Sequence, residues 1–461
     1  MKLGWLFALP RMTVLCLLVH TGHGYAQTFT TLHHFDGAGG SDPTAGLIIS
    51  GNTLYGTTIS GGSGSGTVFK INTNGSGFTN LYSFSPSVFN SSLSKFTNSD
   101  GRGPWAGLVV SGNTLFGVAE SGGSFGLGTI FSIQTDGTGF TNLHSFSGSD
   151  GHDPWGGLTL SSSTLFGATW RGGNSGYGVI YAINTDGTGF TNLYHFNGSD
   201  GRYPNELLLL DEKLFGTTSG GGAFGNGTIF AINTNGSDFT NLHSFSPLQV
   251  GNTNSEGAYP YAGLIASGSR LFGTTGQGGT SGKGVVFAID TNGSGFTNLH
   301  SFSSFDGEYP YSKLATAEDT LFGSTVEGGA ADSGTIFALK SDGTGFTNLY
   351  QFTAITTNTN SDGIYPYAGL VISGDVAWGV AANGGNFGNG TVFSLSLPPN
   401  LPPQLAAFLS GENIILTWPS NTIATLQSAP TPMAVFTNIP GATSPYTNSV
   451  SEPQMFFRLS L

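Results

Sequence analysis

Residues 115–146 read LFGVAESGGSFGLGTIFSIQTDGTGFTNLHSF, and this stretch decides the fold because variants of it recur along the chain. Each copy carries three signatures: Leu-(Phe/Tyr)-Gly, Gly-(Thr/Val)-(Val/Ile)-(Phe/Tyr) and Phe-Thr-Asn-Leu-x-x-Phe. The first signature begins at Leu54, Leu115, Leu165, Leu214, Leu271 and Leu321, with a degenerate copy at Ala377. The second begins at Gly66, Gly128, Gly178, Gly227, Gly284, Gly334 and Gly390. Self-similarity at a period of about 50 residues is typical of solenoids, arrays and propellers.

Each unit is predicted to form four short β-strands. Runs of β-branched and aromatic residues bounded by Gly, Asn and Ser are strand signals. Between the third and fourth runs stands Asn-Gly or Asp-Gly, as at Asn74-Gly75 and Asp136-Gly137, which favours a tight hairpin. Outside the first 26 residues no stretch repeats its apolar residues with a helical period, so the chain is expected to be all-β.

The third signature occurs only six times in full, beginning at Phe78, Phe140, Phe190, Phe239, Phe296 and Phe346. No copy follows the last Gly-Thr-Val-Phe, but a related stretch, FTTLHHF, precedes the first unit at residues 29–35. A ring closes if this N-terminal strand completes the last unit, and closure removes exposed sheet edges. The sequence therefore predicts a seven-bladed β-propeller closed by its N-terminal strand.

The two ends of the chain differ from the repeats. Residues 1–26 combine early basic residues, an apolar run at residues 12–19 and Gly24-Tyr25-Ala26, a pattern that predicts a cleaved signal peptide. The propeller is expected over residues 27–397, followed by a Pro-rich linker at 398–403. Residues 404–461 are predicted to form a small β-sandwich-like domain of fibronectin-III type.

Composition narrows the classes of partner. The formal net charge is −13, and only 8% of the residues are charged. Such a surface disfavours nucleic acid and anionic lipid as partners. The single cysteine, Cys16, lies in the predicted signal peptide, so neither a disulfide nor thiol catalysis is expected in the mature chain. Beyond that leader no transmembrane segment is expected.

The loops between units carry an acid, a glycine and then a proline, as in Asp100-Gly101 with Pro104. The acid is expected to cap a turn by hydrogen bonding to nearby backbone. Five of the seven residues after the prolines are Trp or Tyr and are expected to form an aromatic crown at the channel mouth. These five are Trp105, Trp155, Tyr261, Tyr311 and Tyr367. Aromatic rings with a polar edge suit sugars or peptide side chains, although packing between blades explains the same pattern.

Other candidate ligand-binding residues are departures from the repeat on blades two and three. They are Arg102, His152, Asp153, Trp170 and Arg171. The loops at residues 84–104, 245–260 and 352–366 are longer than the others, and long surface loops often carry binding sites.

Catalytic and metal-binding patterns are absent from the sequence. Four histidines share one repeat position with tyrosines, as His144 does with Tyr82, so they are expected to be structural. No histidine pair has metal-ligand spacing, and neither a metal nor a cofactor is expected. The acids Glu308, Glu327 and Asp332 are expected to be solvated surface groups.

The composite unit, from Leu-Phe-Gly through Gly-Gly and Gly-Thr-Val-Phe to Asp-Gly-Thr-Gly-Phe-Thr-Asn-Leu, resembles the GloVer (Gloeo/Verruco-type) tandem repeat of bacterial secreted and surface proteins. The resemblance spans residues 29–397 and implies export and a repeat fold. It implies no catalytic residues. We therefore expect a secreted or surface-associated, non-catalytic propeller that binds an extracellular glycan or a surface protein. The alternatives are a carbohydrate-active enzyme, a glycosidase or lyase that uses acids of the upper face, and a purely structural surface protein.

Overall fold

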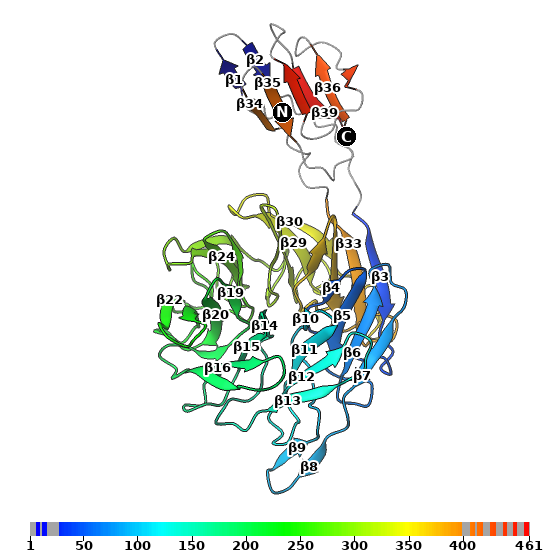
Figure 1. The fold of residues 1–461 in the computed structure, drawn as a ribbon, viewed down its shortest axis with the longest axis vertical. Coiled ribbons are helices and arrows are strands. Elements are labelled where there is room, and N and C mark those ends of the chain that lie inside the picture. The colour runs from blue at the N-terminus through cyan, green and yellow to red at the C-terminus, as the bar shows by residue number, and fades with distance from the viewer. Residues whose placement is uncertain are drawn as a thin grey trace. The chain divides into compact units, whose positions relative to one another are not determined.

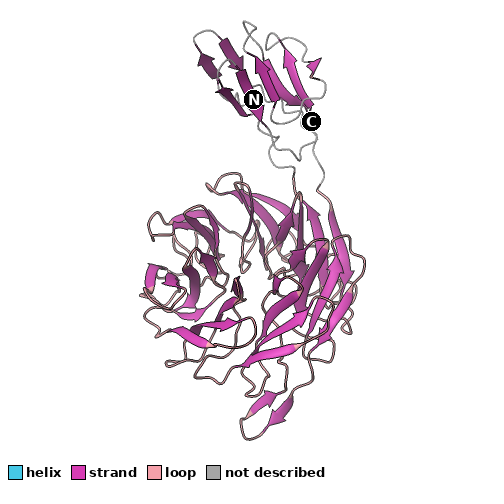
Figure 2. Ribbon diagram, in the orientation of Figure 1, coloured by secondary structure: helices cyan, strands magenta, loops and turns pink. Residues whose placement is uncertain are grey.

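The structure is a computed structural model that describes residues 6–9, 12–15 and 27–398, together with strand segments between residues 406 and 460. Its described residues are all-β and contain no helix, as Figure 2 shows. The chain divides into two compact units, one of Thr28–Ser396 and one of Met1–Gln27 with Leu397–Leu461. The larger unit contains every repeat.

Seven antiparallel sheets form the blades of this larger unit and are arranged around a common centre (Figure 1). Blade 1 consists of β4 (Ile48–Ser50), β5 (Thr53–Thr58), β6 (Thr67–Asn72) and β7 (Thr79–Ser83). Blade 2 consists of β10 (Val109–Ser111), β11 (Thr114–Ala119), β12 (Thr129–Gln134) and β13 (Thr141–Ser145). Blade 3 consists of β14 (Thr159–Ser161), β15 (Thr164–Thr169), β16 (Val179–Asn184) and β17 (Thr191–His195).

Blades 4 to 6 follow the same order. Blade 4 consists of β18 (Arg202–Pro204), β19 (Leu208–Leu210), β20 (Lys213–Gly220), β21 (Thr228–Asn233) and β22 (Thr240–Ser244). Blade 5 consists of β23 (Ile265–Ser267), β24 (Arg270–Thr275), β25 (Val285–Asp290) and β26 (Thr297–Ser301). Blade 6 consists of β27 (Ala315–Ala317), β28 (Thr320–Thr325), β29 (Thr335–Lys340) and β30 (Thr347–Gln351). A separate hairpin, β8 (Val88–Asn90) with β9 (Lys95–Thr97), grows from the loop between blades 1 and 2.

The seventh blade confirms the predicted closure. It contains β31 (Val371–Ser373), β32 (Val376–Ala381) and β33 (Thr391–Ser396), and its fourth strand is the N-terminal β3 (Phe29–His34). β3 pairs antiparallel with β33, with Phe29 opposite Leu395 and His34 opposite Thr391. The two ends of the propeller unit therefore meet within one sheet (Figure 1).

Seven ring stacks join each blade to the next. The His or Tyr of each outer strand lies flat on the Phe that opens the third signature of the following blade, at centroid distances of 3.7–4.2 Å. The pairs are His33–Phe78, Tyr82–Phe140, His144–Phe190, Tyr194–Phe239, His243–Phe296, His300–Phe346 and Tyr350–Phe29. The last pair closes the ring. A His ring and a Tyr ring both lie flat on the facing phenylalanine, which explains why this position accepts either residue.

The glycines of two signatures are required by close packing. A Cβ on Gly117 would lie 2.6 Å from the Phe131 ring, because the side chain of the third strand crosses over the second strand at this point. A Cβ on Gly128 would lie 2.6 Å from Pro154 of the next blade, and Gly128 also has a φ of +107°. Glycine is the residue that adopts such a backbone without strain. The repeat therefore keeps glycine where strands cross and where blades meet.

The second unit contains short strand pairs. β1 (Leu6–Leu9) pairs with β2 (Met12–Leu15) inside the predicted leader. β34 (Ala406–Ser410), β35 (Asn413–Thr417) and β38 (Tyr446–Ser449) form one sheet. β36 (Thr425–Ala429), β37 (Thr437–Asn438) and β39 (Phe456–Ser460) form another. The predicted cleavage site and, apart from Pro398, the predicted linker lie outside the described residues.

Candidate functional site

The acids of the loops between blades hold the ends of the outer strands. The carboxylate of Asp150 accepts hydrogen bonds from the Ser147 backbone N–H at 2.7 Å and from its hydroxyl at 2.9 Å, and it lies 2.9 Å from Nε2 of His144. Burial acts to raise the pKa of Asp150, but these hydrogen bonds outweigh it and leave the pKa lowered. The contacts agree with the turn-capping role expected from the sequence.

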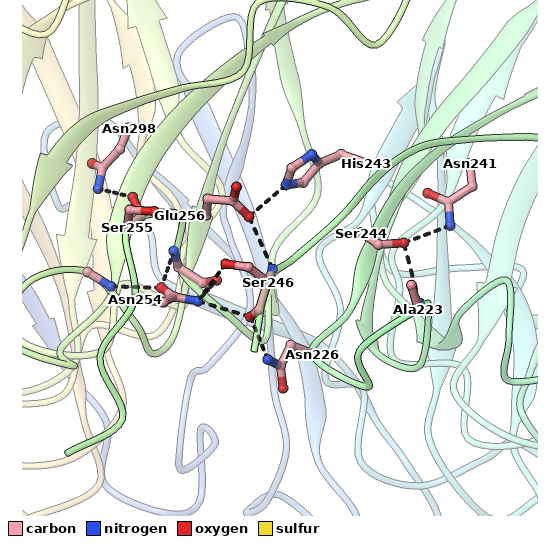
Figure 3. Close-up of polar contacts among 12 residues, drawn as sticks. Ala223, Asn226, Asn241, His243, Ser244, Ser246, Asn254, Ser255, Glu256 and Asn298 are labelled. Carbon is pink, nitrogen blue, oxygen red and sulfur yellow. Dashed lines mark hydrogen bonds and ion pairs between the residues drawn. The ribbon is translucent and has the colours of Figure 1, made fainter. Parts of the chain in front are cut away.

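The three long loops use an asparagine that the sequence analysis did not single out. Figure 3 shows the loop between blades 4 and 5, where Glu256 accepts from the Ser246 backbone N–H at 3.1 Å and Asn254 donates to the Ser246 carbonyl at 3.1 Å. Asn98 and Asn360 make matching contacts in the other two long loops. The sequence signal is Asn-Ser-acid-Gly in place of the Gly-Ser-Asp-Gly of the shorter loops at residues 148–151 and 198–201.

A cavity of about 650 Å³ occupies the centre of the ring and is lined by residues from all seven blades. The aromatic side chains in its lining are Trp105, Trp155, Trp170, Tyr261, Tyr311 and Tyr367. All six belong to the candidate set derived from the sequence. The structure therefore brings the aromatic candidates together around one space.

The residue before each proline helps to place these rings. Asp153 has a φ of +56°, and its carbonyl oxygen accepts the backbone N–H groups of Trp155 and Trp170, each at 2.9 Å. Tyr309 and Tyr365, with φ of +56° and +60°, hold Tyr311 and Tyr367 in the same way. A left-handed backbone is strained for residues other than glycine. The strain is located where the crown residues are aimed at the cavity.

The tryptophan side of the cavity is a stack of rings. Trp155 lies between Trp105 at a centroid distance of 5.6 Å and Trp170 at 4.3 Å, and both contacts are stacked. The ring of Trp170 also contacts the ring of Tyr203 at a centroid distance of 4.5 Å. The guanidinium carbon of Arg171 lies over the Trp170 ring, 4.5 Å from its centroid. Trp155 is still 36% exposed. This stack offers ring edges to a ligand, because neighbouring rings cover its faces.

The tyrosine side of the cavity is more open. Tyr261 is 42% exposed and meets Tyr311 edge-on at a centroid distance of 4.9 Å. Burial raises the pKa of Tyr311, and neighbouring tyrosines and Glu327 add to the effect. Burial also raises the pKa values of Tyr261 and Tyr367. Tyrosine hydroxyls are protonated at neutral pH without any shift, so all three can donate hydrogen bonds, and burial extends this to higher pH.

The polar candidates on blades 2 and 3 lie outside the lining of the cavity. His152 Nδ1 lies 3.1 Å from the Asp153 carboxylate, and His152 bridges to the backbone of Arg171. Arg102 forms the corresponding backbone bridge with Ser121. These residues join the loop between blades to the loop between second and third strands. The observed contacts of these residues therefore stabilise the two loops and do not form the interior of the cavity.

Glu120 is an acid at the tryptophan side that the sequence analysis missed. Burial raises its pKa, and the nearby Asp153 carboxylate adds to this, whereas hydrogen bonding from Trp155 and Trp105 and the charge of Arg102 oppose it. It follows the second strand at a position where blade 3 has Trp170 and blade 5 has Gly276. This departure from the repeat is the sequence signal by which Glu120 could have been found.

Two further residues missed from the sequence form an ion pair inside the cavity. Lys313 Nζ lies 2.6 Å from Glu206 Oε1, and both residues are in the lining. Lys313 stands just before β27 of blade 6 and Glu206 just before β19 of blade 4, where the other five blades have glycine. These glycines are Gly46, Gly107, Gly157, Gly263 and Gly369. This ion pair therefore lies in a cavity whose other lining residues are uncharged.

The acids of blade 6 are closer together than the sequence suggested. Glu308 is only 7% exposed and its carboxylate binds the Lys283 ammonium, so its prediction as a solvated acid is wrong. Glu308 and Glu327 face each other in a backbone bridge. Burial raises the pKa of Glu327, with Asp332 and Glu308 adding to the effect. These acids lie where the backbone bridge between Glu308 and Glu327 joins two loops.

Across the described parts of the chain, no group of three or more His, Cys, Asp or Glu side chains is placed to hold a metal ion. The same residues include no helix long and apolar enough to cross a membrane.

The repeat that builds the cavity can be compared with known families. The pattern of the Gloeobacter/Verrucomicrobia repeat matches residues 86–254 and 248–416, which together make up more than half of the chain. The chain belongs to this family. The Gloeobacter/Verrucomicrobia repeat thus forms propeller blades here, with matches that cross blade boundaries. Comparison with the curated proteins gives no match.

Several solved structures match part or most of the chain. An oligogalacturonate lyase from Vibrio parahaemolyticus matches with a TM-score of 0.52 at 8% identity, covering 82% of this chain and 95% of the lyase. A nidogen/laminin complex matches with a TM-score of 0.37 at 18% identity, covering 55% and 78%. TolB from Acinetobacter baumannii matches with a TM-score of 0.37 at 15% identity, covering 63% and 60%. At these identities the likeness of the lyase concerns the fold alone.

Proposed function

We propose that this member of the Gloeobacter/Verrucomicrobia repeat family is an exported, non-catalytic propeller that binds an extracellular glycan in its central cavity. The observation that carries the proposal is the cavity of about 650 Å³ whose lining includes six Trp and Tyr side chains. This volume lies within the range of roughly 300–1,000 Å³ typical of small-molecule sites. Aromatic rings with polar edges suit the apolar faces and hydroxyl groups of sugars.

The tyrosine side supports a sugar more than an apolar ligand. Tyr261 presents an exposed ring beside the half-buried Tyr311. A tyrosine hydroxyl is protonated at neutral pH, and burial raises the pKa of both residues further. A ring face and a hydroxyl donor within one side chain match the two kinds of surface that a pyranose presents. A segment of a surface protein is the other partner with this chemistry, and the experiment separates the two.

The test is a broad glycan array probed with residues 27–461, followed by calorimetry on the best glycan. We expect Tyr261→Ala and Tyr311→Ala to weaken binding at least tenfold, and Trp155→Ala to weaken it less, because Trp105 and Trp170 cover its ring faces. Phe305→Ala is the matched control, since Phe305 is 90% exposed and lies outside the cavity lining. Binding to no glycan would leave a protein ligand or a structural role.

Export rests on the pattern of residues 1–26. Expression of the full chain in a bacterial host is expected to give a product in the periplasm or medium whose first residue is Gln27. A cytoplasmic product that retains Met1 would contradict this part of the proposal.

A carbohydrate-active enzyme is the second candidate, and the blade 6 acids are the observation that favours it. Glu327, with its raised pKa, is close enough to Tyr311 and Tyr367 to raise their pKa values. An acid with a raised pKa beside a sugar-sized cavity is a group that general acid catalysis uses. Release of reducing ends from a polysaccharide, lost in Glu327→Gln but retained in Asp319→Asn, would establish this function instead.

A further inference from the structure

The ion pair between Glu206 and Lys313 is the polar feature of the cavity that the repeat does not explain. The two residues belong to blades 4 and 6, which are not neighbours in the ring. A glycine stands at the same position in five blades, so the fold itself needs neither side chain.

Stability does not account for this pair. The side chains of Lys313 and Glu206 are 34% and 31% exposed. Ion pairs with this much access to solvent contribute little to the free energy of folding, and holding two flexible side chains in one geometry costs conformational entropy. The pair therefore costs conformational entropy and adds little to stability. Its position in the cavity indicates that it serves to bind a ligand.

Both groups retain unused hydrogen-bonding capacity. Within residues 27–398, the hydrogen bond between Lys313 Nζ and Glu206 Oε1 is the one that either charged group makes. An ammonium has three donors, and a carboxylate can accept about four hydrogen bonds. Two donors of Lys313 and most acceptor sites of Glu206 are therefore available to a ligand in the cavity.

The charges around the pair favour an uncharged ligand. The two charges of the pair cancel, Glu120 and Glu327 lie near the cavity aromatics, and the whole chain carries −13. An anionic sugar bound to Lys313 would place its carboxylate beside that of Glu206, and a cationic amino sugar bound to Glu206 would place its ammonium beside that of Lys313. Like charges held side by side in a binding site are destabilising. A sugar hydroxyl both donates and accepts, so it can bind the intact pair.

We propose that the Glu206–Lys313 ion pair, together with Tyr261 and Tyr311, selects a neutral sugar unit over uronic acids and amino sugars. This inference rests on the proposed function of the cavity. The tyrosine ring supplies stacking, and the pair supplies hydrogen bonds to hydroxyl groups of the same sugar.

The experiment compares neutral, uronic-acid and amino-sugar oligosaccharides on one array, then measures the best neutral binder by calorimetry. We expect wild-type protein to prefer neutral oligosaccharides, and Glu206→Gln and Lys313→Met each to lose at least tenfold in affinity. Lys340→Met is the matched control, because it breaks the Lys340–Asp319 pair, whose atoms lie 2.7 Å apart outside the cavity lining. Its affinity is expected to stay within twofold of wild type.

Two results would overturn the inference while leaving the proposed function intact. One is a wild-type preference for uronic-acid or amino-sugar oligosaccharides. The other is neutral-sugar binding that survives Glu206→Gln and Lys313→Met within twofold but is lost in Tyr261→Ala. Binding to no oligosaccharide would overturn both proposals. If the single variants fail to fold, Glu206→Gly/Lys313→Gly restores the residue of the other five blades and tests the same loss of affinity.

Discussion

His33 differs from its counterparts on the other blades because its ring lacks an acid partner. His144 and His300 each place Nε2 about 3 Å from an aspartate, whereas Nε2 of His33 is buried without a hydrogen-bond partner. Burial lowers the pKa of His33 to about 4, with Asp36 opposing the shift and His34 adding to it. His33 also stacks on Phe78 where β3 meets blade 1. Its protonation is therefore coupled to the packing of the N-terminal strand against blade 1.

The sign of the pH effect follows from the lowered pKa. Between pH 6.5 and 4 the unfolded chain binds more protons at His33 than the folded chain. The stability linked to neutral His33 is full above pH 6.5 and is lost as the pH falls toward 4, at no more than about 1.4 kcal/mol per pH unit. We expect His33→Phe, which keeps the stack, to reduce this loss in urea unfolding at pH 7, 6, 5 and 4. An unchanged pH profile in His33→Phe would show that His33 is not the group responsible.

Adding a Cβ atom at Gly117 tests how tightly the Phe131 ring packs over the second strand. The missing Cβ of Gly117 leaves room for the Phe131 ring, which would lie 2.6 Å from an added methyl group. We expect Gly117→Ala to lower the free energy of unfolding by about 1–3 kcal/mol, the usual range for overpacking a core. Urea denaturation of Gly117→Ala, Phe131→Leu and the double variant Gly117→Ala/Phe131→Leu checks this. If the double variant is not less damaged than the sum of its single variants, the clash is not the cause.

At the scale of elements, strand β3 carries the closure. It pairs with β33, places Phe29 on Tyr350 and is followed by Phe35, which is fully buried between blades 7 and 1. Burying one such phenylalanine contributes roughly 1.5–3 kcal/mol. We therefore expect deletion of residues 27–35 to lower the melting temperature clearly, as measured by calorimetry. An unchanged melting temperature would mean that the ring does not depend on β3.

Rescue separates closure from general damage. A synthetic peptide of residues 27–36, added to the deleted protein, is expected to raise the melting temperature because it can refill the free edge of β33. The same peptide with Phe29→Ala is the control, since it loses the stack on Tyr350. Equal rescue by both peptides would show that the ring contact is unimportant.

At the scale of the whole molecule, the shared seventh blade is expected to make unfolding slow. A circular permutant that moves residues 29–35 behind Leu397 would build every blade from consecutive strands. We expect it to keep the fold and the cavity but to unfold faster, because its last blade can detach without breaking a sheet that holds both ends of the propeller unit. Unfolding rates in urea measure this, with the wild-type chain as reference. Equal rates would remove the shared blade as a source of kinetic stability.

The fold was largely predictable because it rests on local signals that repeat. The Leu-Phe-Gly signature predicts a strand, and Asp-Gly predicts a turn. The orphan strand at residues 29–35 predicts closure of the ring. The cavity residues were predictable in part, because the aromatics follow a recurrent proline. Glu206 and Lys313 meet across non-adjacent blades, and that distance depends on the radius of the ring rather than on spacing in the chain. Their signal was the loss of glycine at one repeat position.

The pairing of β3 with β33 also sets an order of events during synthesis. The strand that completes the propeller is made first, and its partner is made more than 350 residues later, since Thr31 lies opposite Phe393. At about 5–20 residues per second, the early strand waits for tens of seconds. A chain interrupted before β33 keeps a free apolar strand at its beginning and an unfinished blade at its end. Completion of the ring therefore requires that synthesis has passed β33, the last strand of the propeller unit.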